Sequence, residues 1–317
     1  MPDQTYTHAS TSLTLAEKAK DYFQLVKFTL SFTVVFSCVI CYLLAPDITI
    51  GNAHTLWMVL VLFTAGMLIT GSANAINQAV EKDTDALMKR TSTRPIASGR
   101  MTVNQGYIFA IITGAIGILM MAYFFNTKAA GISLLSLFLY GFVYTPLKKI
   151  SAVAVLIGAL PGALPCLIGW VAATNDWSAG GWVMFTIQFL WQFPHFWAIA
   201  WVAHADYSKA GFKLLPSKQG PTKFTALQAV MYALVMIPVG ILPYIYHISG
   251  YWSMWIVLAA NIFMVIQCVR LYIQMDVKAA RRVMFSSYIY LPIVLLALLT
   301  DNVIEKSVLD FILHLYK

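Results

Sequence analysis

Three oxygen-bearing side chains, Asn77, Glu81 and Asp85, follow one another at intervals of four residues at the end of a long apolar segment. In an α-helix this spacing puts all three on one face, whereas Asp83 points elsewhere and is the weaker candidate ligand. Amide and carboxylate oxygens suit a hard cation such as Mg²⁺, which commonly also binds substrate phosphates. The pattern predicts a Mg²⁺ site, and its alternative is a solvated helix end at a membrane surface.

Basic residues follow these candidate ligands. Arg90 and Arg94 come directly after the acidic segment, and Lys148 and Lys149 come after the fourth apolar segment. Guanidinium groups grip phosphate oxygens in bidentate fashion and ammonium groups act as point charges, so these side chains could neutralise a diphosphate. For Lys149, anchoring of a cytoplasmic loop is an equally good interpretation.

A third cluster of candidate residues lies between positions 191 and 216. His195 falls within an apolar segment, where it could bind iron, accept a proton or form a hydrogen bond between helices. Asp206 and Lys209 follow in a polar connection, where Asp206 could hold a second metal ion or orient a base such as Lys209. The interhelical hydrogen bond is the ordinary use of a histidine in this position.

The elements that must position these residues are predicted to be membrane helices. Of the 317 residues, 60% are hydrophobic and 11% are charged, against about 25% charged residues in a soluble domain. The apolar segments are long enough to cross a membrane as helices, and the short alternating strands of a membrane barrel are not seen. The nine predicted spans are approximately 22–45, 55–80, 104–125, 129–147, 150–174, 179–204, 224–246, 252–274 and 282–300.

The distribution of charge predicts the topology. All but three of the 21 Lys and Arg residues fall on one side of these spans; the exceptions are Lys128, Lys306 and Lys317. This asymmetry places the N-terminus and the basic loops in the cytoplasm, and nine spans then place the C-terminus outside. The net charge of +8 is explained by these loops, so it does not indicate nucleic-acid binding.

The predicted organisation is an all-α, polytopic membrane domain between two short tails. A polar cytoplasmic tail covers residues 1–21, without a secretory signal peptide, the helical domain covers 22–300, and a tail outside the membrane covers 301–317. Cys38 and Cys41 have the spacing of a redox pair, but they lie inside the first span and are interpreted as packing thiols. Prolines inside the fifth and sixth spans predict kinks that serve either packing or the lining of a cavity.

Taken together, these residues resemble the intramembrane aromatic prenyltransferase superfamily, and within it the haem O synthase branch. The first superfamily motif is Asn-x-x-x-Asp-x-x-x-Asp, which Asn77, Glu81 and Asp85 match with Glu81 in place of the common Asp. The resemblance covers about residues 22–300. The other matching motifs are Met88-x-Arg90-Thr91-x-x-Arg94-Pro95, Tyr144-Thr145-Pro146-Leu147-Lys148-Lys149, Gly158 to Pro165, Gly169-Trp170, Trp191-Gln192-Phe193-Pro194-His195-Phe196 and Asp206-Tyr207-x-x-Ala210-Gly211.

The resemblance implies nine helices around a membrane-embedded cavity, with a cytoplasmic cap formed by the loops at 81–103 and 205–223. It implies Mg²⁺-dependent transfer of a farnesyl group from farnesyl diphosphate to a vinyl group of haem b, with addition of water, in the bacterial inner membrane. The haem O formed would feed haem-copper oxidases, directly or after conversion to haem A, so haem A synthase and oxidase assembly factors are expected partners. The second superfamily motif is usually rich in Asp, whereas Asp206 is nearly alone here, so the resemblance does not predict a fully ligated second Mg²⁺.

Three other functions compete with this one. A quinone-pathway polyprenyltransferase would use a small aromatic acceptor, but the segment from Trp191 to His195 and the lone Asp206 argue against it. A secondary transporter would account for broken helices and an intramembrane histidine, but its site would lie near the middle of the membrane rather than at the cytoplasmic end. A non-catalytic oxidase assembly factor would not need oxygen ligands at helical spacing.

Overall fold

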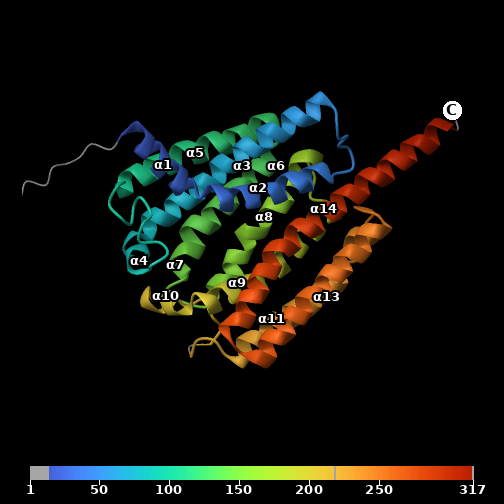
Figure 1. The fold of residues 1–317 in the computed structure, drawn as a ribbon. Helices are drawn as coiled ribbons and strands as arrows, with labels where there is room; N and C mark the ends of the chain where they lie inside the picture. Colours follow the sequence, from blue (N-terminus) through green and yellow to red (C-terminus); the bar gives the residue numbers. More distant parts are fainter. Residues whose placement is uncertain (1–13, 218, 316–317) are drawn as a thin grey trace, which may run out of the picture.

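The computed structural model describes residues 14–217 and 219–315, and every element within these ranges is a helix (Figure 1). The predicted all-α class is therefore confirmed. The elements are α1 (Leu15–Val26), α2 (Phe28–Leu43), α3 (Ala53–Val80), α4 (Lys82–Leu87), α5 (Val103–Phe124), α6 (Thr127–Phe138), the π-helix η1 (Leu139–Tyr144), α7 (Thr145–Leu147), α8 (Ala154–Thr174), α9 (Ala179–Val202), α10 (His204–Lys209), α11 (Lys223–Val239), α12 (Leu242–Ile245), α13 (Tyr251–Gln274) and α14 (Val277–Leu315).

The helices are those of an integral membrane protein. Within the described residues, seven helices or joined helices are long and apolar enough to cross a membrane, and α1 with α2 forms an eighth candidate. Helix α9 is 24 residues long but is not among these candidates; Gln188, Gln192 and His195 lower its hydropathy. The count of nine spans therefore stays a prediction.

The first predicted span differs from the structure, because the chain forms two helices that bend by 47° at Lys27. Lys27 has a φ of 51°, in the left-handed region that residues other than glycine rarely adopt. Asn74 and Gln78 of α3 donate hydrogen bonds, of 3.0 and 2.9 Å, to two of the last carbonyl groups of α1. Polar side chains of α3 thus satisfy the groups that the bend leaves without helical partners.

Helix α8 packs against α2, α6 and α9 and is the most buried of the candidate spans. Gly169 of α8 lies so close to the backbone carbonyl of Cys38 in α2 that a Cβ atom would overlap it. Such small residues let two membrane helices approach each other closely. All four cysteines are buried and free, as the interpretation as packing thiols predicts.

The two ends of the bundle differ. The short helices α4, α7 and α10 lie at one end, and α14 runs past the rest of the bundle at the other (Figure 1). Helix α14 continues without a break to Leu315, beyond the predicted boundary at residue 300, and α1 crosses the predicted boundary at residue 21. The division into tails and domain stays a prediction, and residues 1–13 and 316–317 of the tails lie outside the described residues.

The close contact between α2 and α8 yields a first prediction. We predict that Gly169→Ala lowers the stability of the protein by about 1–3 kcal/mol, as overpacking usually does, because the Cys38 carbonyl belongs to the backbone and cannot swing aside. Thermal unfolding in detergent measures the effect. Gly131→Ala in α6 is the matched control, since nothing lies within 4 Å of its added methyl group and alanine favours a helix. Equal stability of the two variants would contradict the close contact.

Candidate functional site

A cavity of about 780 Å³ lies among α1, α2, α3, α4, η1, α8, α9, α10 and α14. One part of its wall is polar, and the rest is largely apolar. Its charged lining residues are Lys27, Glu81, Asp85, Arg90, Arg94 and Lys148, and its apolar lining residues include Phe28, Leu30, Phe196, Ile199, Val202 and Met284. A wall with these two parts fits an amphiphilic molecule that has an anionic head and an apolar chain.

The predicted shared face of Asn77, Glu81 and Asp85 is present, although α3 ends just before Glu81. The Glu81 amide donates to the Asn77 carbonyl (3.0 Å), and the Asp85 amide donates to the Glu81 carbonyl (2.7 Å). The α-helical hydrogen-bond pattern therefore continues across the break and keeps the three side chains in line. They are only 2%, 4% and 1% exposed, respectively, and all three line the cavity.

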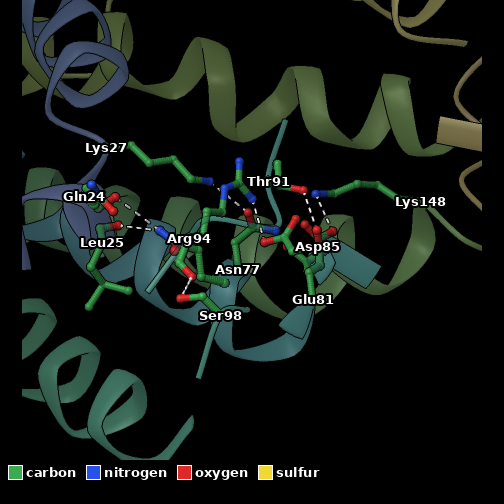
Figure 2. Close-up of polar contacts among 12 residues, drawn as sticks. Gln24, Leu25, Lys27, Asn77, Glu81, Asp85, Thr91, Arg94, Ser98 and Lys148 are labelled. Carbon is green, nitrogen blue, oxygen red and sulfur yellow. Dashed lines mark hydrogen bonds and ion pairs between the residues drawn. The ribbon is translucent and has the colours of Figure 1, made fainter. Parts of the chain in front are cut away.

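Each of the two buried carboxylates faces a cation. Arg94 Nη1 donates to Asp85 Oδ2 at 2.7 Å, and Lys148 Nζ lies 2.7 Å from Glu81 Oε1. Figure 2 shows Lys148 reaching this group from one side and Lys27 from the opposite side. Because an unpaired buried charge is costly, these two cations are what allows the carboxylates to lie inside an apolar bundle.

The amide of Asn77 is fixed by two partners from different elements. Lys27 Nζ donates to Asn77 Oδ1 at 3.0 Å, and Asn77 Nδ2 donates to Thr145 Oγ1 at 3.3 Å. Thr145 in turn donates to the carbonyl of Tyr140 in the π-helix η1. A π-helical turn is often found at a functional site, and here it brings Tyr140, Tyr144 and Lys148 to the cavity. The Asn77 oxygen therefore points toward the cations rather than toward Thr145.

Two carboxylate oxygens, one of Glu81 and one of Asp85, have no hydrogen-bond donor among the described residues. Asp85 Oδ1 and Glu81 Oε1 are buried and accept no hydrogen bond within the part of the chain that the structure describes. The contact of Glu81 Oε1 with Lys148 is short enough for an ion pair but lacks the geometry of a hydrogen bond. Buried oxygens without donors can bind a hard cation, so these two carboxylates and the Asn77 oxygen fit one Mg²⁺ ion. No group of three His, Cys, Asp or Glu side chains suited to a metal occurs in residues 14–217 and 219–315.

The remaining predicted site residues are not all brought together. Arg90 is exposed and lines the cavity, whereas Asp83, Lys149 and Lys209 are exposed and are not among its lining residues. Asp206 is partly buried and is not a lining residue either. Among the described residues of the second loop, the structure brings no carboxylate to the candidate ligands Asn77, Glu81 and Asp85.

The second loop contributes to the cavity through its aromatic side chains instead. Tyr207 and Phe212 line the cavity, and the Lys213 amide donates to the Lys148 carbonyl at 2.8 Å. The Lys148 ammonium lies 4.7 Å from the centre of the Tyr144 ring and 5.7 Å from that of Phe212, within the range of a cation–π contact. These contacts hold Lys148 toward Glu81.

His195 is buried and is not itself among the cavity-lining residues, although Ile199, one helical turn away on the same face of α9, lines the cavity. Its Nδ1 is 2.7 Å from Ser287 Oγ of α14. The Ser287 hydroxyl donates its own proton to the Met284 carbonyl at 2.6 Å, so Nδ1 must be the donor to Ser287. His195 therefore carries its proton on Nδ1 and a lone pair on Nε2. This hydrogen bond joins α9 to α14. It is the bond between helices that the sequence analysis gave as one of three possible roles of His195.

Lys27 lines the cavity and contacts Asn77, and the sequence analysis does not identify it as a candidate residue. In the sequence it counts only as one of the positive charges at the end of the first span. The available signal was its position within the apolar segment 22–45, where a charged side chain is expected to have a partner. That partner, Asn77, is 50 residues away in the chain, so only the fold brings the two together.

The sequence and the fold both have known counterparts. The model of the UbiA prenyltransferase family matches residues 34–290. The protoheme IX farnesyltransferase of Cytophaga hutchinsonii is 46% identical over 290 residues, which are 91% of this chain and 100% of that protein. The same enzyme of Flavobacterium psychrophilum is 40% identical over 286 residues, covering 89% of this chain and 94% of the relative.

Two solved structures share the fold. A digeranylgeranylglyceryl phosphate synthase gives a TM-score of 0.74 at 21% identity, covering 90% of this chain and 99% of the other. A UbiA homolog from Archaeoglobus fulgidus bound to GPP and Mg²⁺ gives a TM-score of 0.66 at 15% identity, covering 88% of this chain and 99% of the other. Since the family model spans most of the sequence and the relatives align over nearly all of it, the chain belongs to the UbiA prenyltransferase family.

Proposed function

We propose that this chain transfers the farnesyl group of farnesyl diphosphate to a vinyl group of haem b, with addition of water, to give haem O and diphosphate. The names of its relatives from Cytophaga hutchinsonii and Flavobacterium psychrophilum support this choice of donor and acceptor. The observation that carries the proposal is the buried face of Asn77, Glu81 and Asp85 at the polar part of an otherwise apolar cavity. Such a cavity fits a diphosphate joined to an isoprenoid chain.

The polar part of the cavity would bind and activate the diphosphate. Asn77, Glu81 and Asp85 would hold Mg²⁺ through their oxygen atoms, and the ion, when bound, supplies positive charge to the leaving group. Arg94 and Lys148, which already face this site, would stabilise the charge that develops on the diphosphate as its bond to carbon breaks. One such positioned contact is typically worth about 3 kcal/mol in the transition state.

The apolar wall would control the fate of the allylic cation. The carbon–oxygen bond breaks with its electron pair on the diphosphate, and the π electrons of the haem vinyl group form the new carbon–carbon bond. Positive charge then lies on the carbon next to the porphyrin ring, where water adds and loses a proton. Phe28, Phe196 and Ile199 line the cavity and would exclude water from the farnesyl cation until the vinyl group reaches it.

We further propose that the polar part of the cavity faces the cytoplasm of a bacterium, with the C-terminus outside the inner membrane. The positive-inside distribution of Lys and Arg supports this orientation. The basic connections that precede α5 and follow α10 lie at the end of the bundle that carries α4 and α7 (Figure 1). The end of α14 lies at the opposite end (Figure 1). Haem O formed there would pass to haem-copper oxidases, with haem A synthase or oxidase assembly factors as partners.

The acceptor is tested by the mass of the product. Purified protein in detergent is incubated with farnesyl diphosphate, Mg²⁺ and haem b in water labelled with ¹⁸O. We predict a haem that has gained one farnesyl group and one labelled water, and no product when 4-hydroxybenzoate replaces haem b. Prenylation of 4-hydroxybenzoate without any change in haem b would contradict the proposal and favour a quinone-pathway enzyme.

Substitution of two neighbouring carboxylates, Asp85 and Asp83, tests the proposed metal site. We predict that Asp85→Ala lowers turnover by about 100- to 1,000-fold, because it removes a buried ligand and leaves Arg94 without its partner. Asp83→Ala is the matched comparison, since this exposed side chain lies outside the cavity lining, and it should retain most of the activity. Membrane insertion of both variants is checked first. Normal turnover in purified Asp85→Ala protein would exclude Asp85 as a metal ligand.

The lone pair on His195 Nε2 suits either the iron of haem b or the water that adds to the product. We predict that Ser287→Ala lowers kcat by about 10- to 100-fold, as loss of an orienting partner commonly does, and that His195→Ala lowers it at least as much. The absorption spectrum of bound haem b separates the two roles, because only loss of an iron ligand changes it. His204→Ala, in α10, is the control. Unchanged turnover and spectrum in His195→Ala would show that the residue only packs.

A further inference from the structure

A second cavity, of about 360 Å³, lies beside the first, between the connection that leads into α8 and the second loop. Tyr207, Phe212 and Leu214 line both cavities, so the two share one wall. The backbone joins them as well, because the Lys213 amide donates to the Lys148 carbonyl at 2.8 Å. The second cavity is therefore a side chamber of the first.

The lining of the second cavity suits an anion. Its polar lining residues are Ser151, His204, Ser208, Lys213 and Ser217. None of its described lining residues is acidic, and Asp206, although next to Tyr207 in the chain, is not among them. Helix α8 begins at Ala154, directly beyond the lining residues 150–152. The positive end of its dipole therefore lies near the cavity and favours a negative charge there.

Three of these residues can hold an anion. The Lys213 ammonium group forms no ion pair within residues 14–217 and 219–315. The Ser151 and Ser217 hydroxyls each accept a hydrogen bond from the backbone amide two residues further along the chain, at 3.2 and 3.1 Å. Their own protons are then left for a bound anion. His204 and Ser208 face each other within α10, at 3.4 Å, and are not counted as ligands.

We propose that the second cavity binds the propionate groups of haem b, while the vinyl half of the macrocycle lies in the first cavity. The inference rests on the proposed function, because it concerns the acceptor of the same reaction. In haem b the two propionates stand side by side on one edge of the macrocycle, and the vinyl groups are on the other half. A macrocycle along the shared wall would bring its propionates to Lys213, Ser151 and Ser217 and a vinyl group toward the diphosphate.

The charges of the first cavity explain why a separate place is needed. Arg94 and Lys148 already face Asp85 and Glu81, and the same cations would serve the diphosphate. Two carboxylates in a largely apolar cavity are costly unless donors or positive charges meet them. An acceptor with two carboxylates therefore needs a second positive site, and the second cavity supplies one across the shared wall.

The shared wall suits a flat aromatic acceptor. The rings of Tyr207 and Phe212 lie edge to face, 5.7 Å apart, and aromatic rings pack well against the face or edge of another π-system. The backbone holds them in place: the Phe212 amide donates to the Tyr207 carbonyl at 2.9 Å. Gly211, between them, has a φ of 75°, which favours glycine. The motif from Asp206 to Gly211 thus builds this wall and does not supply a metal ligand.

A purely structural role for Lys213 predicts a different result. If this residue only held the second loop against Lys148, its substitution would disturb the diphosphate site and every acceptor alike. If its ammonium group binds a propionate, substitution weakens the binding of haem b and leaves an acceptor without free carboxylates unaffected. The selectivity of the loss therefore distinguishes the two roles.

The experiment compares haem b with its dimethyl ester, which keeps the iron, the macrocycle and both vinyl groups but has no free carboxylate. Purified full-length protein in detergent is titrated with each compound, and binding is followed by the absorption spectrum of the haem. We expect the ester to bind at least about tenfold more weakly, because hydrogen bonds to charged groups are stronger than those to neutral ones. This measurement needs no variant, so it does not depend on the folding of one.

Lys213→Met supplies the second measurement. We expect its affinity for haem b to fall about fivefold, as for a partly solvated ion pair, while its affinity for the ester and its KM for farnesyl diphosphate stay unchanged. Ser151→Ala, which removes one hydroxyl donor, should show the same selectivity. Lys213→Arg keeps the charge and should restore wild-type binding. Lys278→Met, which removes an exposed lysine of α14 that is not a lining residue of either cavity, should change no value.

The outcomes separate the two claims. Equal binding of haem b and its ester, unchanged binding of haem b in Lys213→Met, or an equal loss for both compounds in that variant would overturn the propionate site and leave the proposed function intact. A raised KM for farnesyl diphosphate in Lys213→Met would likewise favour the structural role. Failure of the wild-type protein to farnesylate either compound would instead overturn the proposed function on which the inference rests.

Discussion

The burial of Glu81 and Asp85 inside a bundle of apolar helices is the constraint on which the rest of the site depends. Removing one partner of a buried ion pair typically costs about 3–5 kcal/mol, because it leaves an uncompensated charge. The fold meets this cost by bringing Arg94 and Lys148 from two other segments to within 2.7 Å of the carboxylates. The loop after α4 and the end of α7 must therefore lie where they do for the bundle to be stable.

The irregular parts of the backbone serve the same purpose. The bend at Lys27 brings an ammonium group to Asn77, and Asn74 and Gln78 of the same helix satisfy the carbonyl groups that the bend exposes. The π-helix η1 leads into α7 and sets Thr145 against the Asn77 amide. Backbone groups freed in a membrane helix must find partners within the protein, so polar residues of α3 stabilise the breaks that complete the site.

Much of the site can be predicted from sequence, because its central feature is local. Asn77, Glu81 and Asp85 share a face through helical spacing alone, and hydropathy indicates the surrounding helices. The contacts between distant segments cannot be predicted in this way. The partner of Lys27 is 50 residues away in the chain. Lys148 and Lys149 are neighbours of the same residue type, and only the fold shows that Lys148 contacts Glu81 while Lys149 is exposed. The bend at Lys27 cannot be predicted for the same reason, because the side chains that stabilise it, Asn74 and Gln78, lie on α3.

The most direct measurement is an experimental structure of the protein with Mg²⁺ and farnesyl thiodiphosphate bound. We expect one Mg²⁺ ion between Asn77, Glu81 and Asp85, with the diphosphate in contact with the ion and with Arg94 and Lys148. The isoprenoid chain should lie along Phe196 and Ile199. A diphosphate bound away from this face, or a Mg²⁺ ion bound elsewhere, would contradict the central role given to Glu81 and Asp85 and their paired cations.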